Sequence, residues 1–431
     1  MTISSLQVRR AFFCIRLLSI VCSGHCPAKE LEARVDPRVE LMSIVFRLAG
    51  NPEYNPANSK SGYSEEVESY FGTFRDHPVI QKARELRSTR GVSYDAVMSL
   101  AVHLTDAKNP DELTPFHPRP DRLDERWQTH EARDFLKLLR DFVRESRFAE
   151  FAAKHEAFYA RCAARMEKKL SERDYVEFFN RYFGARPTAE FHVILGMLNG
   201  GGNYGVGVSF PDGREIISPI IGISSFDSDG LPVFGDDFVP LIIHEFCHSY
   251  TNQVVDENAD ALQEAGERLH ALVAEEMASQ AYGTWKTVMY ESFVRAVVVR
   301  AMAAFEGTAA AEKQIVYEES RGFLWTREFG ALLTHYEKSR DQYKSFDEFL
   351  PEVIAFLRDA APRYDQKDAE VEKNRPHVVS ISPANGDNSV DPAIDTLVIT
   401  FDRPMTHGRY SLCGDGDSFP QFVSPPRNNE N

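Results

Sequence analysis

The stretch Phe238-Val-Pro-Leu-Ile-Ile-His244-Glu245-Phe-Cys-His248 contains two histidines four residues apart, with a glutamate between them. The apolar run before His244 predicts a buried helix. Residues at i and i+4 lie on one face of a helix, so the two imidazoles would lie side by side. The pattern therefore predicts that His244 and His248 can share a metal ion.

Zinc fits this pattern because it accepts neutral histidine nitrogen at roughly 2.0–2.1 Å. A catalytic zinc ion has three protein ligands and an open position for water. Glu245 lies between the histidines and would be placed to take a proton from that water. The competing interpretation, two hydrogen-bonded histidines on an ordinary core helix, is less favoured because this spacing rarely arises by chance.

The third ligand separates the classes of zinc peptidase. The extended HExxHxxGxxH pattern would require glycine and histidine where Thr251 and Val254 stand, which rules out a metzincin. A Gly-Thr pair followed by a ligand aspartate is also absent, because Trp285 and Lys286 follow Gly283-Thr284. A glutamate ligand, the gluzincin arrangement, remains.

Two glutamates compete for this third position. Glu267 has the short spacing from the motif that several such peptidases use. Glu291 lies at the start of an apolar helix that includes Phe293 and Val294, where a buried carboxylate needs a partner. Glu267 lies instead in the acid-rich segment 256–276, which we expect to be solvated. Spacing favours Glu267, and sequence context favours Glu291.

Periodicity divides most of the chain into a helical part, a mixed part and a second helical part. Apolar residues recur at helical spacing in 39–48, 64–75, 78–88, 93–104, 130–146, 148–166 and 171–184. Between 190 and 226, short strands are predicted at 190–195, 206–210 and 215–223, and the last two form a hairpin. Helices return from about 237 to about 360. We therefore expect an α+β fold that is mostly helical, with a small antiparallel sheet.

Several segments resemble a bacterial family catalogued as a domain of unknown function and regarded as gluzincin-like zinc metallopeptidases. They are His244-Glu-Phe-Cys-His-Ser-Tyr250, the Gly-rich 199–205, Glu291-Ser-Phe-Val-Arg-Ala296, Val35-Asp-Pro-Arg-Val-Glu-Leu41 and Gly91-Val-Ser-Tyr-Asp-Ala-Val97. The likeness covers roughly residues 30–360 and implies a zincin-like catalytic domain, which we place at residues 29–361.

This resemblance implies that His244, His248 and Glu291 bind the metal and that Glu245 is the general base. Cys247 departs from the serine expected there, and its side chain should lie off the histidine face. Asn252 and Asp256 are candidates for holding a histidine tautomer, although surface capping is an equal alternative.

A change of composition separates the C-terminal part. Residues 362–377 are polar and charged, which predicts a linker. Beyond it, Val378–Ser382 and Thr396–Phe401 have the composition of strands. The segments around Ser382-Pro-Ala-Asn-Gly386 and Asp402-Arg-Pro-Met405 resemble a bacterial Ig-like domain of surface-layer and secreted proteins. Residues 378–431 number 54, about half of an Ig sandwich, so we expect a partial module.

Charge and hydropathy limit the partners and the location. Lys and Arg total 49 against 65 Asp and Glu, and this net charge of −16 argues against nucleic acid as the main partner. Arg9 and Arg10 precede a short apolar run, interrupted by Arg16, which predicts a signal peptide over residues 1–28. No later uncharged apolar run approaches the ~20 residues of a membrane span. We expect a secreted, periplasmic or cell-surface protein.

These patterns predict an exported zinc-dependent metallohydrolase, a gluzincin-type peptidase in which Glu245 assists attack of zinc-bound water on a peptide bond. The peptide or protein substrate would pair with a strand of the hairpin, and we favour 215–223. An oxyanion donor is also needed. The candidates are Tyr204, Tyr282, Tyr290, His270 and Arg295, although for Arg295 a role as partner of Glu291 or of a neighbouring carboxylate is favoured.

The alternative hypothesis is a surface or carbohydrate-associated binding protein whose zinc site is structural or degenerate. A closed site with four protein ligands would favour it. Under either hypothesis, the Ig-like segment would provide contact with a cell surface or polysaccharide.

Overall fold

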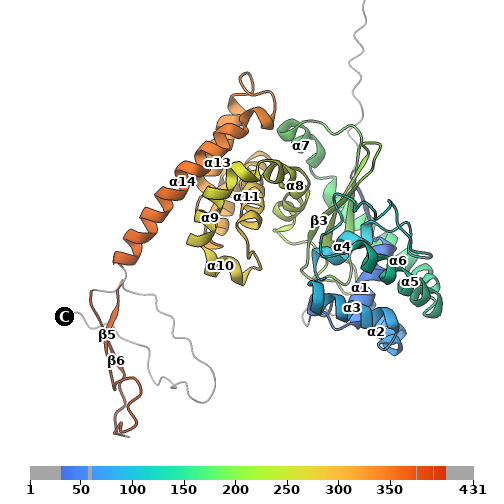
Figure 1. The fold of residues 1–431 in the computed structure, drawn as a ribbon, viewed down its shortest axis with the longest axis horizontal. Helices are drawn as coiled ribbons and strands as arrows, with labels where there is room; N and C mark the ends of the chain where they lie inside the picture. Colours follow the sequence, from blue (N-terminus) through green and yellow to red (C-terminus); the bar gives the residue numbers. More distant parts are fainter. Residues whose placement is uncertain (1–30, 57–60, 375, 392, 404–431) are drawn as a thin grey trace, which may run out of the picture.

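The computed structural model describes residues 31–56, 61–374, 376–391 and 393–403. It confirms an α+β fold (Figure 1). The seven helical segments predicted before residue 190 are all helical. They are α1 Pro37–Leu48, α2 Gly62–Phe71, α3 Pro78–Arg90, α4 Asp95–Val102, α5 Thr129–Glu145, α6 Phe148–Leu170 and α7 Tyr175–Phe183, with short 3-10 turns at Pro52–Tyr54 and Gly72–Phe74.

One four-stranded sheet follows the first helices in the chain and has the order β1-β2-β4-β3. Its strands are β1 Glu32–Arg34, β2 Ala189–Gly196, β3 Tyr204–Ser209 and β4 Glu215–Gly222. The predicted hairpin is confirmed, because β3 and β4 pair antiparallel with Tyr204 opposite Ile220.

The expectation of a purely antiparallel sheet was wrong. Strands β1, β2 and β4 run parallel to one another, which makes the sheet mixed. After β2, the chain skips the neighbouring position in the sheet and forms β3 at the edge. It then returns to form β4 between β2 and β3. Periodicity within each strand carries no information on this order, and β1, with three residues, is too short to produce an alternating pattern.

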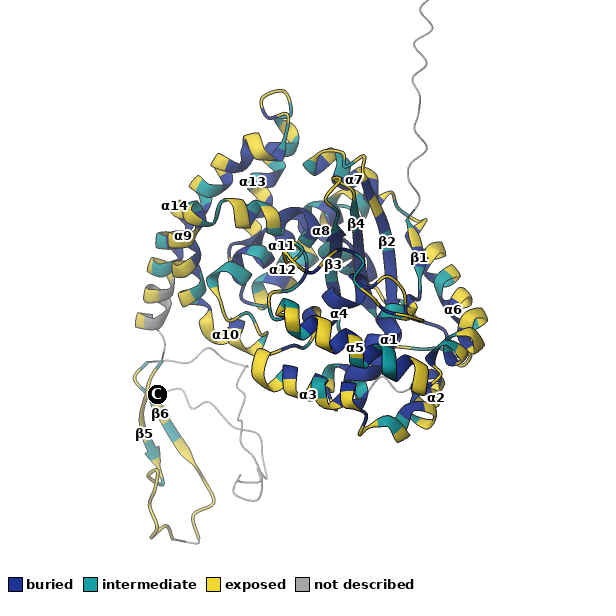
Figure 2. Ribbon diagram, turned by 45° about the vertical axis from the view of Figure 1, so that its right-hand side comes forward, coloured by how far each residue is buried: buried dark blue, intermediate teal, exposed yellow. Residues whose placement is uncertain are grey.

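The second helical part packs against this sheet through α8 Phe238–Glu257. Helix α8 contacts β3 and β4 and, on its other side, α11 Trp285–Phe305 (Figure 1). The remaining helices pack against α11 or against one another, and Figure 2 shows their inner faces buried and their outer faces exposed. They are α9 Ala259–Leu272, α10 Ala274–Ser279, α12 Thr308–Ser320, α13 Thr326–Lys338 and α14 Phe346–Asn374.

Helix α14 corrects the prediction of a linker at 362–377, because the helix continues to Asn374. Two charged residues of this segment form ion pairs on the helix surface: Arg363 pairs with Asp359 at 2.8 Å, and Asp365 pairs with Arg268 at 2.6 Å. A polar, charged composition fits a solvated helix as well as a linker, so composition did not distinguish them.

The predicted C-terminal strands are present as β5 Val378–Ser382 and β6 Val398–Phe401, paired antiparallel. The rest of the expected Ig-like segment, residues 404–431, and the expected signal peptide, residues 1–28, lie outside the described residues. Across the described ranges, every helix is too short or too polar to span a bilayer.

Candidate metal centre

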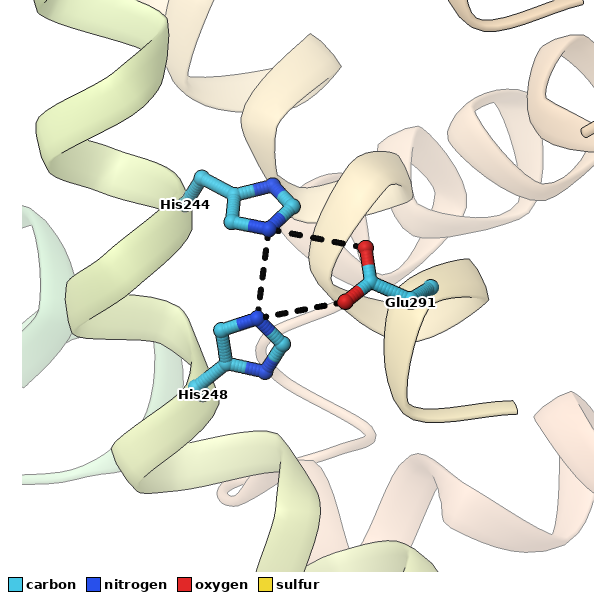
Figure 3. A group of neighbouring side chains, drawn as sticks. All are labelled: His244, His248 and Glu291. Atoms are coloured by element: carbon cyan, nitrogen blue, oxygen red, sulfur yellow. Dashed lines mark hydrogen bonds and ion pairs between the residues drawn. The ribbon is translucent and has the colours of Figure 1, made fainter. Parts of the chain in front are cut away.

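Helix α8 carries the two histidines of the motif. Ile242, Ile243 and Phe246 on this helix are buried in the core, and they hold it between the sheet and α11. His244 and His248 then project from one face of α8 toward α11, as Figure 3 shows. Their Nε2 atoms lie 3.2 Å apart.

Glu291 completes a group of three from the second turn of α11 (Figure 3). Its Oε2 atom lies 3.5 Å from His244 Nε2, and its Oε1 atom lies 3.4 Å from His248 Nε2. Two ligands at zinc distance in a tetrahedral site are about 3.3 Å apart, so the three donors fit a single ion. Within the described parts of the chain, no fourth histidine, cysteine, aspartate or glutamate joins the group.

Glu267, the competing glutamate, lies on the exposed surface of α9. Its carboxylate accepts a hydrogen bond of 2.7 Å from Gln263, one turn earlier on the same helix. The buried site therefore brings Glu291, and not Glu267, to the two histidines. Cys247 is buried and does not belong to the group, as expected from its position on the helix.

Asn252 supports the second histidine. Its Oδ1 atom lies 3.1 Å from His248 Nδ1. When Nδ1 carries the proton and donates it to this oxygen, the lone pair of Nε2 is free to bind a metal. Asp256, the other candidate for this role, instead pairs with Lys286 at 2.5 Å and accepts a hydrogen bond from the Tyr290 hydroxyl.

Arg295 lies behind Glu291, the third candidate ligand. Its Nη2 atom donates to Glu291 Oε2 at 3.0 Å and to the Tyr282 hydroxyl at 3.3 Å. Its Nη1 atom donates to Glu318, a carboxylate on α12 that is only 2% exposed. The guanidinium also lies 4.2 Å from the centre of the Phe323 ring. One arginine thus connects the Glu291 carboxylate of α11 to the buried Glu318 carboxylate of α12.

The protonation states suit metal binding. Burial lowers the pKa of His244 to about 3, so this imidazole is neutral at physiological pH. Burial raises the pKa of Glu291, but attraction to His244, Arg295 and His248 outweighs burial and lowers it overall. Because His244 is neutral, we regard Arg295 as the main cation that keeps Glu291 ionised. Neutral imidazole and ionised carboxylate are the forms that bind a metal.

Glu245 is 6% exposed, and its side chain forms no hydrogen bond or ion pair with any of the described residues. Burial raises the pKa of this carboxyl group, and repulsion from Glu291 raises it further. A carboxyl group that is desolvated beside a metal site and has no structural partner is free to exchange a proton.

Strand β3 brings the sheet against the motif. A methyl group placed on Gly205 would lie 2.6 Å from the Glu245 carbonyl oxygen and 2.9 Å from His248 Cβ. Only glycine allows β3 to approach α8 this closely. The strand order also corrects the choice of 215–223 as the substrate-pairing strand. Strand β4 is paired on both sides, whereas β3 is an edge strand.

The five oxyanion candidates fall into different places. Tyr282 and Arg295 lie beside Glu291, where each is hydrogen-bonded to the other. Tyr290 is bonded to an aspartate on α8, and His270 lies on α9. The buried Tyr204 hydroxyl has no hydrogen-bond partner in the described structure. Of the five, Arg295 thus contacts Glu291 directly, and Tyr282 contacts Arg295.

Two residues of this region were missed from the sequence. Glu318 lies in the charged stretch 317–321, and Arg122 lies in a loop before α5, so both have the composition of surface positions. The structure buries Glu318 against Arg295 and places Arg122 against β3. No local pattern identifies either role, because each depends on a partner far along the chain.

Comparison with known proteins gives one match. Residues 31–356 match the family described as Domain of unknown function (DUF4932). No curated protein and no solved structure matches the chain. The matched region includes β3, α8 and α11, the three elements that build the site.

Proposed function

The chain belongs to this family of unknown function, and we propose that it is a zinc-dependent metallohydrolase that cleaves peptide bonds. The observation that carries the proposal is the group formed by His244, His248 and Glu291. Glu245, which follows His244 in the sequence, is buried. Three protein ligands with room for further ligands are typical of catalytic zinc sites, whereas structural sites have four.

The donor set fits zinc. Zinc accepts both imidazole nitrogen and carboxylate oxygen, and the spacing of these three donors suits a tetrahedral ion. A zinc ion held there would act as a Lewis acid toward water and a carbonyl oxygen. Glu245 would take the proton from that water and pass it to the leaving amine. Asn252 and Arg295 would hold His248 and Glu291 in position.

We infer that the substrate is an extended peptide or protein segment. Strand β3 is the edge of the sheet and contacts the motif helix at Gly205, so its main chain is the one available to pair with a peptide beside the metal. Side chains contribute less to pairing of this kind, which suits a range of peptide sequences.

We also propose that the protein is exported and that its C-terminal Ig-like segment contacts a cell surface or polysaccharide. The strand pair β5–β6 supports the second part. Sequencing the N-terminus of protein recovered from the culture medium or periplasm tests export, and an intact N-terminus on protein found only in the cytoplasm would contradict it.

Zinc stoichiometry is the primary test. We expect about one zinc ion per wild-type chain, and loss of zinc in His248→Ala and Glu291→Gln. Glu267→Gln is the matched control and should retain zinc, because its carboxylate lies on the surface. Absence of zinc from the wild type after reconstitution would overturn the proposal.

Glu245→Gln tests catalysis separately. This variant should bind zinc as the wild type does and lose peptide hydrolysis by about 100-fold or more. Zinc retention with no hydrolysis of any peptide by the wild type would favour a binding protein with a structural or degenerate zinc site.

A further inference from the structure

Arg122 lies across the edge strand on the side of the motif helix. Its backbone oxygen accepts a hydrogen bond of 3.1 Å from Ser99 on α4, and its Nε atom donates to Ser209 Oγ at the end of β3, also at 3.1 Å. A methyl group on Gly207 would lie 3.1 Å from Arg122 Nη1. Alternate strand residues face the same side, so Gly207 faces the side that Gly205 presents to α8.

The positive charge of Arg122 is only partly balanced by its hydrogen-bonded carboxylate. Arg122 Nη2 and Arg186 Nη1 both donate to a single oxygen, Glu215 Oε2, at 3.2 and 2.9 Å. Two guanidinium groups therefore share one carboxylate oxygen. No described residue accepts a hydrogen bond from Arg122 Nη1, and 21% of the Arg122 side-chain surface remains exposed. Arg186 also lies 4.2 Å above the ring of Tyr250, two residues beyond the motif.

Burial adds to this imbalance. Burial lowers the pKa of Arg122 and Arg186 lowers it further, whereas Glu215 and, to a smaller extent, Asp121 raise it, so that the pKa is lowered overall. A half-buried guanidinium of this kind gains from a second carboxylate, since charge-assisted hydrogen bonds to arginine are among the strongest. The net charge of the chain is −16, so a local surplus of positive charge runs against its overall balance.

The distance along the strand relates this cation to the metal ligands. Gly205 contacts His248, and Gly207 is two residues, or about 7 Å, further along β3. A peptide extended beside β3 would repeat its side-chain direction at the same interval. A carboxylate about two residues from the bond near the metal would therefore approach Arg122.

We propose that Arg122 and Arg186 form a subsite for a carboxylate of the peptide substrate, either its C-terminal carboxylate or an acidic side chain. This inference rests on the proposed peptidase function. It assigns to the site a preference for anionic peptides, and it makes Arg122 a specificity-determining residue.

The test compares matched short peptides on the zinc-loaded full-length protein. One pair differs by a C-terminal carboxylate or amide, and a second series differs by aspartate or asparagine at single positions. We expect kcat/KM to favour at least one carboxylate form by about tenfold or more, and Arg122→Gln to remove most of that ratio. The C-terminal pair and the aspartate series distinguish the two sources of the carboxylate.

Controls separate charge recognition from folding. Arg214→Gln alters an exposed arginine of the same hairpin, paired with Asp212 at 2.9 Å, and should keep the wild-type ratio. Arg122→Lys keeps the charge without the planar fork and should show an intermediate ratio. Equal kcat/KM for the carboxylate and the uncharged member of every peptide pair would overturn the proposal. So would an unchanged ratio of these kcat/KM values in Arg122→Gln.

A binding measurement distinguishes failure of this inference from failure of the proposed function. Calorimetry on zinc-loaded Glu245→Gln should show tighter binding of the carboxylate peptides, and the preference should fall when Arg122→Gln is added. Preferential binding without hydrolysis by the wild type would contradict only the peptidase activity. Equal affinities, or no binding of either peptide, would contradict the carboxylate subsite.

Discussion

Arg295 and Glu291 lie one turn apart on α11, and Arg295 Nη2 donates to Glu291 Oε2 at 3.0 Å. On its other side the same guanidinium binds Glu318 of α12. All three side chains are at most 7% exposed. A buried cation between two buried carboxylates holds Glu291 in place, and its removal leaves charges without a partner.

Arg295→Leu should therefore lower the free energy of unfolding of the metal-free protein by about 3–5 kcal/mol. Urea denaturation monitored by circular dichroism measures this change. Arg327→Leu is the control, since Arg327 forms exposed ion pairs with Glu312 and Glu319 and its loss should have little effect. Equal effects of the two substitutions would show that the buried network does not stabilise the fold.

Gly205→Ala tests the contact between β3 and the motif helix. The new methyl group would meet the Glu245 carbonyl oxygen at 2.6 Å, so β3 or α8 must move. We expect destabilisation of about 1–3 kcal/mol, together with weaker zinc binding. Gly201→Ala provides the control, because a methyl group there meets nothing within 4 Å. Wild-type stability and zinc affinity in Gly205→Ala would contradict the observed packing.

Asn252→Leu removes the acceptor that orients His248. Loss of such a partner of a metal-binding histidine should weaken zinc affinity by about 10–100-fold. Competition with a chromophoric chelator measures the dissociation constant. Gln253→Leu, at an exposed neighbour that bonds Glu257, should keep the wild-type affinity. If both variants bind zinc equally well, Asn252 has no part in positioning His248.

Glu40 provides a prediction on pH and stability that is independent of the metal centre. This carboxyl group of α1 is fully buried, and it accepts hydrogen bonds from the Tyr63 hydroxyl at 2.8 Å and the Met197 N–H at 3.0 Å. Burial raises its pKa from 4.5 to about 7. The folded protein therefore keeps a proton that the unfolded chain releases between these two values.

The contribution of Glu40 to stability is complete below about pH 4.5 and is lost as the pH rises to about 7. The loss amounts to roughly 3 kcal/mol. Glu40→Gln imitates the protonated group, so its stability relative to wild type should increase over this interval and level off above it. Urea denaturation from about pH 5 to about pH 8 tests this, with the exposed Glu65→Gln as control. A constant difference between Glu40→Gln and wild type would refute the prediction.

Local pattern was sufficient for much of the fold. Helical periodicity identified α1 through α7 to within a few residues, and the turn at 211–213 identified the β3–β4 hairpin. These features depend on neighbours within one or two turns of the chain. The linker prediction failed because exposed helices and linkers share a charged composition, as α14 shows.

The sequence by itself determined the motif: residues 244 and 248 share a helical face whatever surrounds them, because four residues are close to one helical turn. Patterns in the sequence did not decide between the two candidates for the third ligand, because spacing favoured Glu267 and context favoured Glu291. Only the packing of α11 against α8 decided which carboxylate meets the histidines. The edge position of β3 and the burial of Glu318 were likewise decided by tertiary contacts, since each joins residues that are distant in the chain.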